Sequence, residues 1–229
     1  MTSKVFDPLN DEKSSLSLVQ LCASDLMIAN AAKVSFGQSS DELGEAEIGL
    51  INFLMRERHG SPFEHNMFTF HVRCPIFVAR EWFRHRIGSF NEYSGRYKEM
   101  KPDFYIPSVK DVRTQVGKPG SYRFESMAEE VAELVREQVA EAARTSWSFY
   151  QWQLDQGVAK ELARDVLSVN IYTEFYWTVN ARSLMNFLSL RNHVAALREI
   201  RYFAECVEVL FATAMPITHA AFEKTRLAP

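Results

Sequence analysis

The segment Arg84–Tyr97, with the sequence RHRIGSFNEYSGRY, restricts the fold and the chemistry of this chain more than any other stretch. Its two glycines and its run of polar residues predict a loop, although its four apolar residues share the spacing of a helical face. The side chains of Arg84, Arg86 and Arg96 are planar forks that suit phosphate or carboxylate groups. A charged and solvated loop is the simplest alternative, and the segment by itself does not exclude it.

The residues just before this segment favour an anion site over a plain surface loop. Residues 74–83, CPIFVAREWF, predict a helix with Pro75 in its first turn. The helix dipole favours cations at the C-terminal end by about 0.3–1 kcal/mol each, which is a structural reason for part of the basic charge. That reason does not extend to Glu92, Ser94 and Arg96. An apolar helix that delivers arginines into a polar loop is typical of an anion site on a rigid support.

The properties of the whole chain exclude several classes of protein. The chain has 229 residues, 47% of them hydrophobic and 24% charged, which predicts one sizeable globular domain. A net charge of −3 does not favour nucleic acid or an anionic membrane, so any anion site must be local. The cysteines Cys22, Cys74 and Cys206 are scattered without metal-ligand spacing, which indicates a reducing compartment and no structural zinc. The sequence has no secretory signal and no apolar run near the ~20 residues of a membrane span, so we expect a soluble, cytoplasmic protein.

Periodicity and end signals predict the other elements of secondary structure. The predicted strands are Ser15–Cys22, Met67–Val72 and Tyr172–Asn180, and Lys98–Gly120 is predicted to be an extended excursion. The first two predicted helices run from Ser24 or Asp25 to about Val34 and from a capping box at Ser39–Glu42 to Gly60. The later ones are a long amphipathic helix from about Phe124 to Trp152, a helix at Val158–Leu167 and a last helix from about Ala195 to Met215. We expect the apolar stripe of the long helix, from Met127 to Ala142, to lie in the core or in a subunit interface.

A helix is also predicted to begin after Asn180, and its first turn carries an unusual charge. Asn180 is a suitable N-cap residue, and Arg182 then lies in the first turn, where a cation opposes the helix dipole. A local rule broken in this way is typical of a functional residue. Asn186 lies one turn beyond Arg182 on the same face, and Arg191 follows near the end of the segment.

These residues form a set of arginines with polar companions, without any common nucleotide fingerprint. The set comprises Arg84, Arg86, Arg96, Arg164, Arg182 and Arg191, with Glu92, Ser94, Asn180 and Asn186. Ligands that carry several phosphates and heterocycles with donor and acceptor edges suit such a set. Composition alone does not choose between a dinucleotide beside a nucleoside monophosphate and, for example, an RNA end.

The motif of the central segment resembles that of a known family. The pattern Arg-His-Arg, seven residues, then Ser is met by residues 84–86 and Ser94, and it resembles the motif of the flavin-dependent thymidylate synthases. The longer form is also in register at Ser89, Asn91, Glu92, Arg96 and Tyr97. The resemblance extends from about Ala31 to about Arg191 and includes the sequences HGSPFEH at 59–65 and TVNARSLMNFLSLR at 178–191.

The resemblance implies a fold and an activity. The fold would be the α+β fold of this family, one domain over residues 1–229 with a small sheet flanked by long helices. The reaction would be the reductive methylation of deoxyuridine monophosphate at C5, with methylenetetrahydrofolate as carbon donor, FAD as hydride carrier and a nicotinamide dinucleotide, taken as NADPH, as reductant. The protein would be a homotetramer in which the residues from Glu92 to Arg96 reach a site in a neighbouring subunit.

The resemblance also implies roles for individual residues. Arg191 would stabilise charge on the pyrimidine, and Ser94 would take part in catalysis. The substrate contacts would be Glu81, Arg84, Glu92, Ser94, Gly95, Arg96, Arg164 and Arg191. The FAD contacts would be Ser35, His59, Ser61, Arg84, His85, Arg86, Asn91, Glu92, Asn180, Arg182 and Asn186. No metal is expected, because the histidines at 59, 65 and 71 match no common ligand spacing.

One position departs from the family pattern. Glu81 lies three residues before the motif, where family members have glutamine. A carboxylate cannot donate to a pyrimidine carbonyl and repels a phosphate. Two hypotheses follow: Arg84 neutralises Glu81, or Glu81 accepts a hydrogen bond from a ribose hydroxyl.

Other functions and mechanisms remain open at this point. The chain could be a nucleotide-binding regulator without turnover, or a single-stranded nucleic-acid binder that stacks bases on Tyr93 and Tyr97. The acidic balance of the chain argues against the second. A nucleophilic cysteine is not expected because none of the three lies in the arginine set, and Ser94 has no evident general base. Charge stabilisation by Arg191 is therefore the favoured mechanism.

Overall fold

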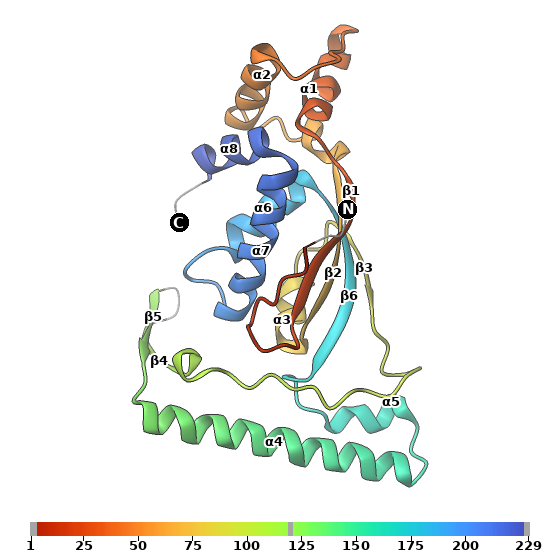
Figure 1. Cartoon of the computed structure of the whole chain (residues 1–229), viewed down its shortest axis with the longest axis vertical. Helices are drawn as coiled ribbons and strands as arrows, with labels where there is room; N and C mark the ends of the chain where they lie inside the picture. The colour runs from red at the N-terminus through yellow and green to blue at the C-terminus, as the bar shows by residue number, and fades with distance from the viewer. Residues whose placement is uncertain (1–3, 119–120, 227–229) are drawn as a thin grey trace. The chain divides into compact units, whose positions relative to one another are not determined.

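The largest sheet has four strands in the order β1-β2-β6-β3 (Figure 1). The strands are β1 (Ser15–Cys22), β2 (Met67–Pro75), β6 (Tyr172–Asn180) and β3 (Ser89–Glu92). The computed structural model describes residues 4–118 and 121–226. The hydroxyls of Thr69 and Thr178 lie 3.0 Å apart, and the next pair along the strands, Phe70 and Trp177, stacks at 5.4 Å. The pairing moves forward along β2 and backward along β6, so these strands are antiparallel.

The three strands predicted from the sequence are confirmed, with one change at the end of β2, but the loop predicted at Arg84–Tyr97 is wrong in part because it contains the strand β3. Alternate residues of β2 are buried from Phe68 to Val72, as the period of two predicts. The predicted helix at residues 74–83 is wrong at its start, because Cys74 and Pro75 complete β2 and α3 spans Ile76–Trp82. The residue before a proline is biased toward extended backbone, which keeps Cys74 in the strand.

The fold divides into two compact units that alternate along the sequence. The first consists of the described residues of Met1–Val72, Glu81–Asn91 and Phe175–Pro229. The second consists of Arg73–Arg80 and the described residues of Glu92–Glu174. The strands β2, β3 and β6 each run from one unit into the other.

The first unit contains a cluster of large aromatic side chains to which α6 and α7 contribute. The helices of this unit are α1 (Asp25–Lys33), η1 (Val34–Phe36), α2 (Glu45–Arg56), η2 (Ser61–His65), α6 (Ala181–Arg191), α7 (Arg198–Ala214) and α8 (Pro216–Thr225). The ring of Trp82 lies 5.3 Å from that of Trp177, 4.9 Å from that of Phe187 and 5.8 Å from that of Phe203. All four side chains are fully buried. The cluster fixes the end of α3, from which residues 84–87 continue.

Two predictions for the first unit are corrected. The capping box at Ser39–Glu42 is wrong, because α2 begins at Glu45 after Gly44. The carboxylate of Glu47 accepts a hydrogen bond from the backbone N–H of Gly44 at 3.0 Å and also pairs with Lys33. The bond from Lys33 lowers the pKa of Glu47 to about 2. The last predicted helix corresponds to α7, but a further helix, α8, begins at Pro216, a favoured first residue.

The second unit contains a long helix and a hairpin. Its elements are η3 (Val109–Asp111), β4 (Arg113–Lys118), β5 (Ser121–Ser126), α4 (Glu129–Asp155), α5 (Lys160–Ala163) and η4 (Arg164–Val166). The hairpin of β4 and β5 is antiparallel and occupies part of the excursion predicted at Lys98–Gly120, of which residues 119–120 lie outside the described residues. The predicted helix at Val158–Leu167 is only a short α-helix and a 3-10 turn. None of the helices in the described ranges combines the length and hydropathy of a membrane span.

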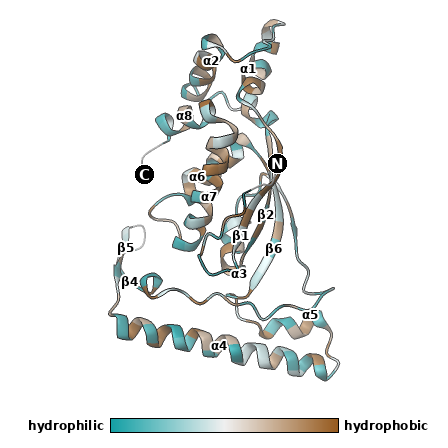
Figure 2. Cartoon of the chain, in the orientation of Figure 1, coloured by the Kyte–Doolittle hydropathy of each residue, from teal (hydrophilic) through white to brown (hydrophobic). Residues whose placement is uncertain are grey.

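The predicted apolar stripe of α4 does not form the core of the second unit. The buried residues of this helix are Ala132, Ala143, Ser146 and Tyr150, whereas Val131 and Leu134 are 46% and 58% exposed. Hydrophilic and hydrophobic residues accordingly alternate along α4 in Figure 2. Whether the stripe is a subunit interface stays a prediction. The predicted start near Phe124 is wrong, because Phe124 lies in β5 and α4 begins at Glu129. The helix runs to Asp155, slightly beyond the predicted Trp152, and stops before Gly157, whose φ of +78° suits glycine.

Candidate active site

An open cavity of about 850 Å³ in the first unit brings together many of the predicted site residues. Its wall is made by η2, by the segment after α3 and by α6. Glu64, Ile87 and Leu190 contribute to it, together with the predicted residues Arg84, His85, Arg86, Asn180, Arg182, Asn186 and Arg191. Residues more than 100 positions apart in the chain therefore share one site.

Helix α6 supplies one side of the cavity, and its first residue is fixed as predicted. Asn180 is the N-cap, and its side-chain oxygen accepts a hydrogen bond from the backbone N–H of Ser183 at 2.8 Å. Arg182 and Asn186 are four residues apart, so they lie on the same face and both reach the cavity.

Arg182 is balanced by a carboxylate that the sequence analysis did not single out. Its Nη1 donates to Oε1 of Glu64, which offsets the repulsion between this cation and the dipole of α6. A Cβ atom at Gly60 would lie 2.6 Å from Cζ and Nε of Arg182. The guanidinium therefore lies against the backbone of Gly60, and any larger residue there would make it shift.

Arg191 at the other end of α6 is held by two partners. Its Nε donates to Nε2 of His85 at 2.9 Å, and its Nη1 lies 2.9 Å from Oε2 of Glu81. Only 16% of its side chain is exposed. These contacts fix the guanidinium in the wall of the cavity and leave the rest of its N–H donors for a ligand.

His85 is neutral at physiological pH because its surroundings oppose a charge. Burial, together with the charges of Arg191 and Arg84, lowers the pKa of His85 from 6.5 to about 4. The neutral ring has a free electron pair on Nε2, which is what the N–H of Arg191 requires. The ring also packs edge-on against Phe187 at 5.0 Å, and this contact holds its orientation.

The structure gives Glu81 a partner that neither hypothesis named. Its carboxylate pairs with Arg191 rather than with Arg84. Arg84 and Arg86 are exposed, and they form no ion pair with any of the described residues. Two cations thus remain available to an anionic ligand, while the charge of Arg191 is balanced within the protein.

A second cavity, of about 880 Å³, shares Arg182, Asn186 and Leu190 with the first. The predicted residue His59 lies on its wall, next to the ring of Phe53 at 5.7 Å. The sequence analysis missed its basic residues Arg56, Arg58, His193 and Arg226. They come from three separate segments of the chain, and no local pattern marks them.

Four predicted FAD contacts lie outside the walls of both cavities, Glu92 of the second unit among them. Ser35 is exposed in η1, Ser61 is the first residue of η2 and Asn91 is exposed in β3. Their contacts with a cofactor stay a prediction.

Another group of predicted residues belongs to the second unit. A Cβ atom at Gly95 would lie 3.2 Å from Cδ of Arg164, so these two residues are in contact. Nε of Arg96 lies 3.1 Å from Oε2 of Glu161. Glu92 accepts a hydrogen bond from the hydroxyl of Thr173 at 2.7 Å. Ser94 lies in the same segment and is half-buried.

Two of the three cysteines have settings that disfavour a nucleophilic thiolate. Burial and the charge of Glu92 raise the pKa of Cys74 well above its ordinary value. Burial, followed by the charge of Glu205, raises the pKa of Cys206 to about 11. Cys22 is exposed in β1 and lines neither cavity.

A cleft lined by arginines and amides, with one guanidinium held by a neutral histidine, is typical of an enzyme site for a small anionic ligand rather than of a surface for a nucleic-acid strand. Residues 17–217 match the family model described as thymidylate synthase complementing protein. The chain belongs to the flavin-dependent thymidylate synthase family and is an enzyme of this kind.

Individual relatives that bear the same family name are similar to this chain over nearly its full length. The flavin-dependent thymidylate synthase of Tropheryma whipplei (strain TW08/27) is 46% identical over 98% of this chain and 99% of its own length. The protein of that name from Streptomyces coelicolor is 47% identical over 97% of both chains. Among solved structures, the UMP/dUMP methylase PolB from Streptomyces cacaoi, bound with 5-Br dUMP, is similar with a TM-score of 0.87. That chain is 44% identical to this one, with 94% of this chain and 97% of that chain covered.

Proposed function

We propose that this protein methylates deoxyuridine monophosphate at C5, with methylenetetrahydrofolate as the carbon donor, FAD as the hydride carrier and NADPH as the reductant of the flavin. The observation that carries the proposal is Arg191, a largely buried guanidinium held in the cavity wall by His85 and Glu81. The methylase named among the structural neighbours acts on UMP and dUMP, which supports a pyrimidine nucleotide as the substrate here.

The proposed role of Arg191 is to stabilise negative charge on the pyrimidine. C5 of uracil is a weak nucleophile, and its attack becomes easier when charge that develops toward N3 and O4 meets a cation. A guanidinium fixed beforehand loses no free energy to reorganisation at the moment of reaction. Neutral His85 and the carboxylate of Glu81 hold Arg191 in position, and its remaining N–H donors would contact the ring.

The residues of the first cavity fit FAD. Arg84, Arg86 and Arg182 offer guanidinium donors suited to a pyrophosphate, and Asn180 and Asn186 carry amides on the same wall. Gly60 leaves room for Arg182 to lie against the backbone. The flavin, when bound, supplies the hydride that completes the methyl group, while the protein binds and orients the reactants. Further contacts are proposed from Ser35, His59, Ser61, His85, Asn91 and Glu92.

The proposal also includes a homotetramer with shared sites. Glu92, Ser94, Gly95, Arg96 and Arg164 would contact the nucleotide in a neighbouring copy, and the contact between Gly95 and Arg164 supports a common role. Residues 1–229 would act as one domain in the cytoplasm. Mixing Arg191→Ala protein with Arg96→Ala protein tests the sharing. Partial recovery of activity is expected, because some sites would combine two unaltered halves. A fully active monomer in sedimentation at assay concentration would contradict the shared site.

The turnover experiment uses purified, flavin-loaded protein with deoxyuridine monophosphate, methylenetetrahydrofolate and NADPH. Thymidine monophosphate should form, and omission of any one reactant should stop it. UMP is the comparison substrate because of the UMP/dUMP methylase neighbour. Ser94→Ala should lower the rate without abolishing it. A folded, flavin-loaded protein that makes no thymidylate would refute the proposed activity.

A further inference from the structure

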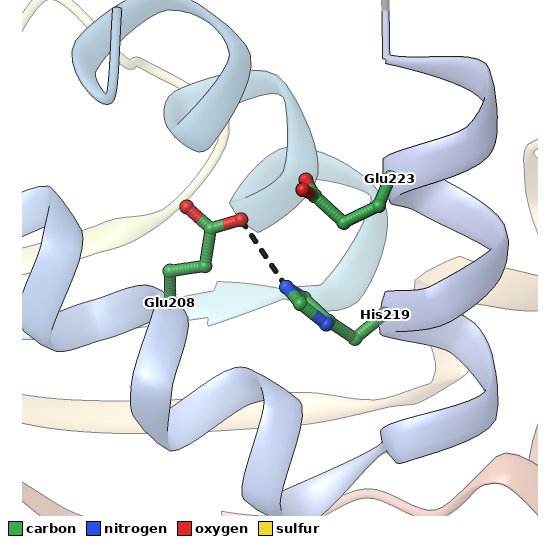
Figure 3. Close-up of side chains that lie close together, drawn as sticks. All are labelled: Glu208, His219 and Glu223. Atoms are coloured by element: carbon green, nitrogen blue, oxygen red, sulfur yellow. Dashed lines mark hydrogen bonds and ion pairs between the residues drawn. The ribbon is translucent and has the colours of Figure 1, made fainter.

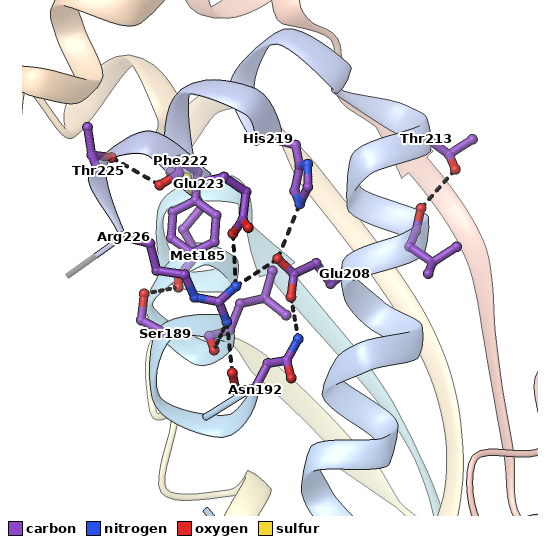
Figure 4. A network of polar contacts seen from close by, with 12 residues as sticks. Met185, Ser189, Asn192, Glu208, Thr213, His219, Phe222, Glu223, Thr225 and Arg226 are labelled. Carbon is purple, nitrogen blue, oxygen red and sulfur yellow. Dashed lines mark hydrogen bonds and ion pairs between the residues drawn. The ribbon is translucent and has the colours of Figure 1, made fainter. Parts of the chain in front are cut away.

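Arg226, just beyond the end of α8, is hydrogen-bonded to the end of α6. Its Nη2 donates to the backbone oxygen of Leu188 at 2.8 Å and to that of Asn192 at 3.1 Å (Figure 4). These oxygens belong to the last turn of α6 and to its C-cap residue; the oxygen of Leu188 also accepts a hydrogen bond from the backbone N–H of Asn192 at 2.9 Å, so Arg226 is its second donor. A cation at this end also complements the helix dipole. Arg226 therefore closes the last turn of the helix that carries Arg191.

Carboxylates hold Arg226 in this position. Its Nη1 lies 2.8 Å from Oε1 of Glu208 on α7 and 2.9 Å from Oε1 of Glu223 on α8. Glu208 also accepts a hydrogen bond from the side-chain amide of Asn192. The side chains of Arg226 and Glu208 are only 19% and 14% exposed, so solvent screens their pairing little. The residue next to Arg191 is thus tied to the same carboxylate as Arg226.

Glu208 is ionised in this network. Burial alone would raise its pKa, but hydrogen bonds from Asn192 and His219 and the charge of Arg226 together lower it below the ordinary value. A charged carboxylate makes the stronger hydrogen bonds to both the guanidinium and the amide.

A metal ion is the obvious alternative occupant of this cluster. Single ligand atoms of Glu208, His219 and Glu223 all lie within 4.8 Å of one another, and His219 Nε2 is 3.2 Å from Glu208 Oε1 (Figure 3). However, the guanidinium of Arg226 already bonds to both carboxylates (Figure 4). A divalent cation would have to share the same oxygens with a fixed positive charge. The cluster is therefore filled by an arginine.

We propose that Arg226 and Glu208 are positioning residues for Arg191, which they hold in the cavity wall through the last turn of α6. The N-terminal end of this helix is fixed by the cap of Asn180, and the C-terminal end depends on Arg226. Without it, the carbonyl of Asn192 would lose its donor and that of Leu188 would keep only the N–H of Asn192, so the last turn would fray more readily within the folded protein. The inference rests on the proposed role of Arg191 in nucleotide binding and turnover.

The test is a double-mutant cycle on flavin-loaded protein. Arg226→Gln and Arg191→Ala are made singly and together, and the affinity for 5-bromo-deoxyuridine monophosphate and the kcat per bound flavin are measured. In the parent background, Arg226→Gln should weaken binding and lower kcat by about tenfold. In the Arg191→Ala background, the same change should have almost no effect, because Arg226 acts through Arg191. Arg226→Lys, which keeps the charge but cannot donate to both carbonyls and both carboxylates, should give an intermediate loss.

The matched control is Arg201→Gln on α7, which removes another arginine–glutamate contact, at 3.0 Å from Glu205 and more exposed. This variant should retain the affinity and kcat of the parent. An equal loss from Arg226→Gln in both backgrounds would mean a general structural role and overturn the inference. If Arg226→Gln does not fold, Arg226→Lys carries the same cycle. A rise in melting temperature on addition of zinc to the parent protein would also overturn it, because a metal would then replace the arginine. Separately, an Arg191→Ala protein with unchanged affinity and turnover would refute the proposed function itself.

Discussion

The two ends of α6 each carry an arginine paired with a glutamate, but the two pairs differ in exposure. At the N-terminal end, the side chains of Arg182 and Glu64 are 58% and 43% exposed, and the guanidinium of Arg182 donates to Glu64. At the C-terminal end, Arg191 is 16% exposed and bonds to both His85 and Glu81. An exposed pair contributes about 0–1 kcal/mol to stability, whereas breaking a buried pair costs several times more. A ligand can therefore displace Glu64 from Arg182 easily, while Arg191 is fixed before any ligand arrives.

The largest expected effect follows from removal of the fixed arginine. Arg191→Ala should lower kcat/KM for deoxyuridine monophosphate by about 100-fold or more, the scale of deleting a preorganised charge contact. The flavin content of the folded protein should remain close to that of the parent. The measurement is turnover per bound flavin. Unaltered turnover in this variant would mean that the fixed Arg191 matters no more for activity than the exposed Arg182.

Removal of the exposed arginine should affect the cofactor more than the fold. Arg182→Ala should weaken flavin retention by about tenfold, the scale of one charge-assisted contact to phosphate. The melting temperature should change little, because the cation opposes the helix dipole and its pair with Glu64 is exposed. Flavin fluorescence during dialysis measures retention. Arg144→Ala, which breaks the exposed contact with Glu141 on α4, is the control. A protein that melts much earlier but retains flavin would show that Arg182 is structural.

Two substitutions of Glu81 separate its charge from its hydrogen bond. Glu81→Gln keeps an acceptor for Arg191 and should stay within about threefold of the parent activity. Glu81→Leu removes the acceptor and should lose about tenfold, because the guanidinium is then held by His85 alone. Steady-state kinetics with deoxyuridine monophosphate decide between them. Equal losses in both variants would mean that the negative charge, rather than the hydrogen bond, matters.

The acid dependence of stability should report on His85. Its folded pKa, about 4, lies below the ordinary 6.5, so the unfolded chain takes up a proton first as the pH falls. The contribution of His85 to stability is complete above about 6.5 and declines as the pH falls from there toward 4. His85→Gln keeps an acceptor for Arg191 without titrating, so its melting temperature should decline less over this range. An identical decline in both proteins would exclude His85 as a contributor.

The smallest effects are expected at the cysteines. Single substitutions of Cys22, Cys74 and Cys206 by Ala should leave turnover per bound flavin within about twofold, since an unreactive thiol contributes only packing. Some loss of stability is expected at Cys74, which is fully buried. Loss of methylation in a folded, flavin-loaded Cys→Ala protein would mean that a thiol, rather than Arg191, activates the pyrimidine.

The sequence predicted those parts of the fold that depend on local signals. The strands β1 and β6 and the caps at Ser24 and Asn180 were predicted because alternation and capping side chains act over a few residues. The capping box at Ser39–Glu42 failed because α2 begins only at Glu45, where the carboxylate of Glu47 accepts from the N–H of Gly44 and from the hydroxyl of Ser40. The stripe on α4 failed because periodicity shows an apolar face without showing what covers it.

The site was predicted only where a motif or a resemblance supplied it. The residues of Arg84–Arg86 and of α6 were identified in this way, and the cavity brings them together. Glu64 and Arg226 were missed because their partners lie 118 and 38 residues away along the chain. Helix and strand periodicities relate residues only a few positions apart, so they do not reveal partners this far apart in the sequence. Pairing of this kind becomes visible only when the fold is known.

Because Arg182, Asn186 and Arg191 all belong to one uninterrupted helix, the length of that helix fixes the spacing of these three side chains in the cavity wall. A rise of 1.5 Å per residue places the ends of this set about 13 Å apart along the axis. One residue inserted between Asn186 and Arg191 would turn Arg191 by about 100° around the helix and out of the cavity wall. Substitutions along the outer face of α6 leave the spacing of the three side chains unchanged, whereas an insertion or deletion in α6 alters that spacing. The length of α6 should therefore vary far less among working variants of this enzyme than its composition.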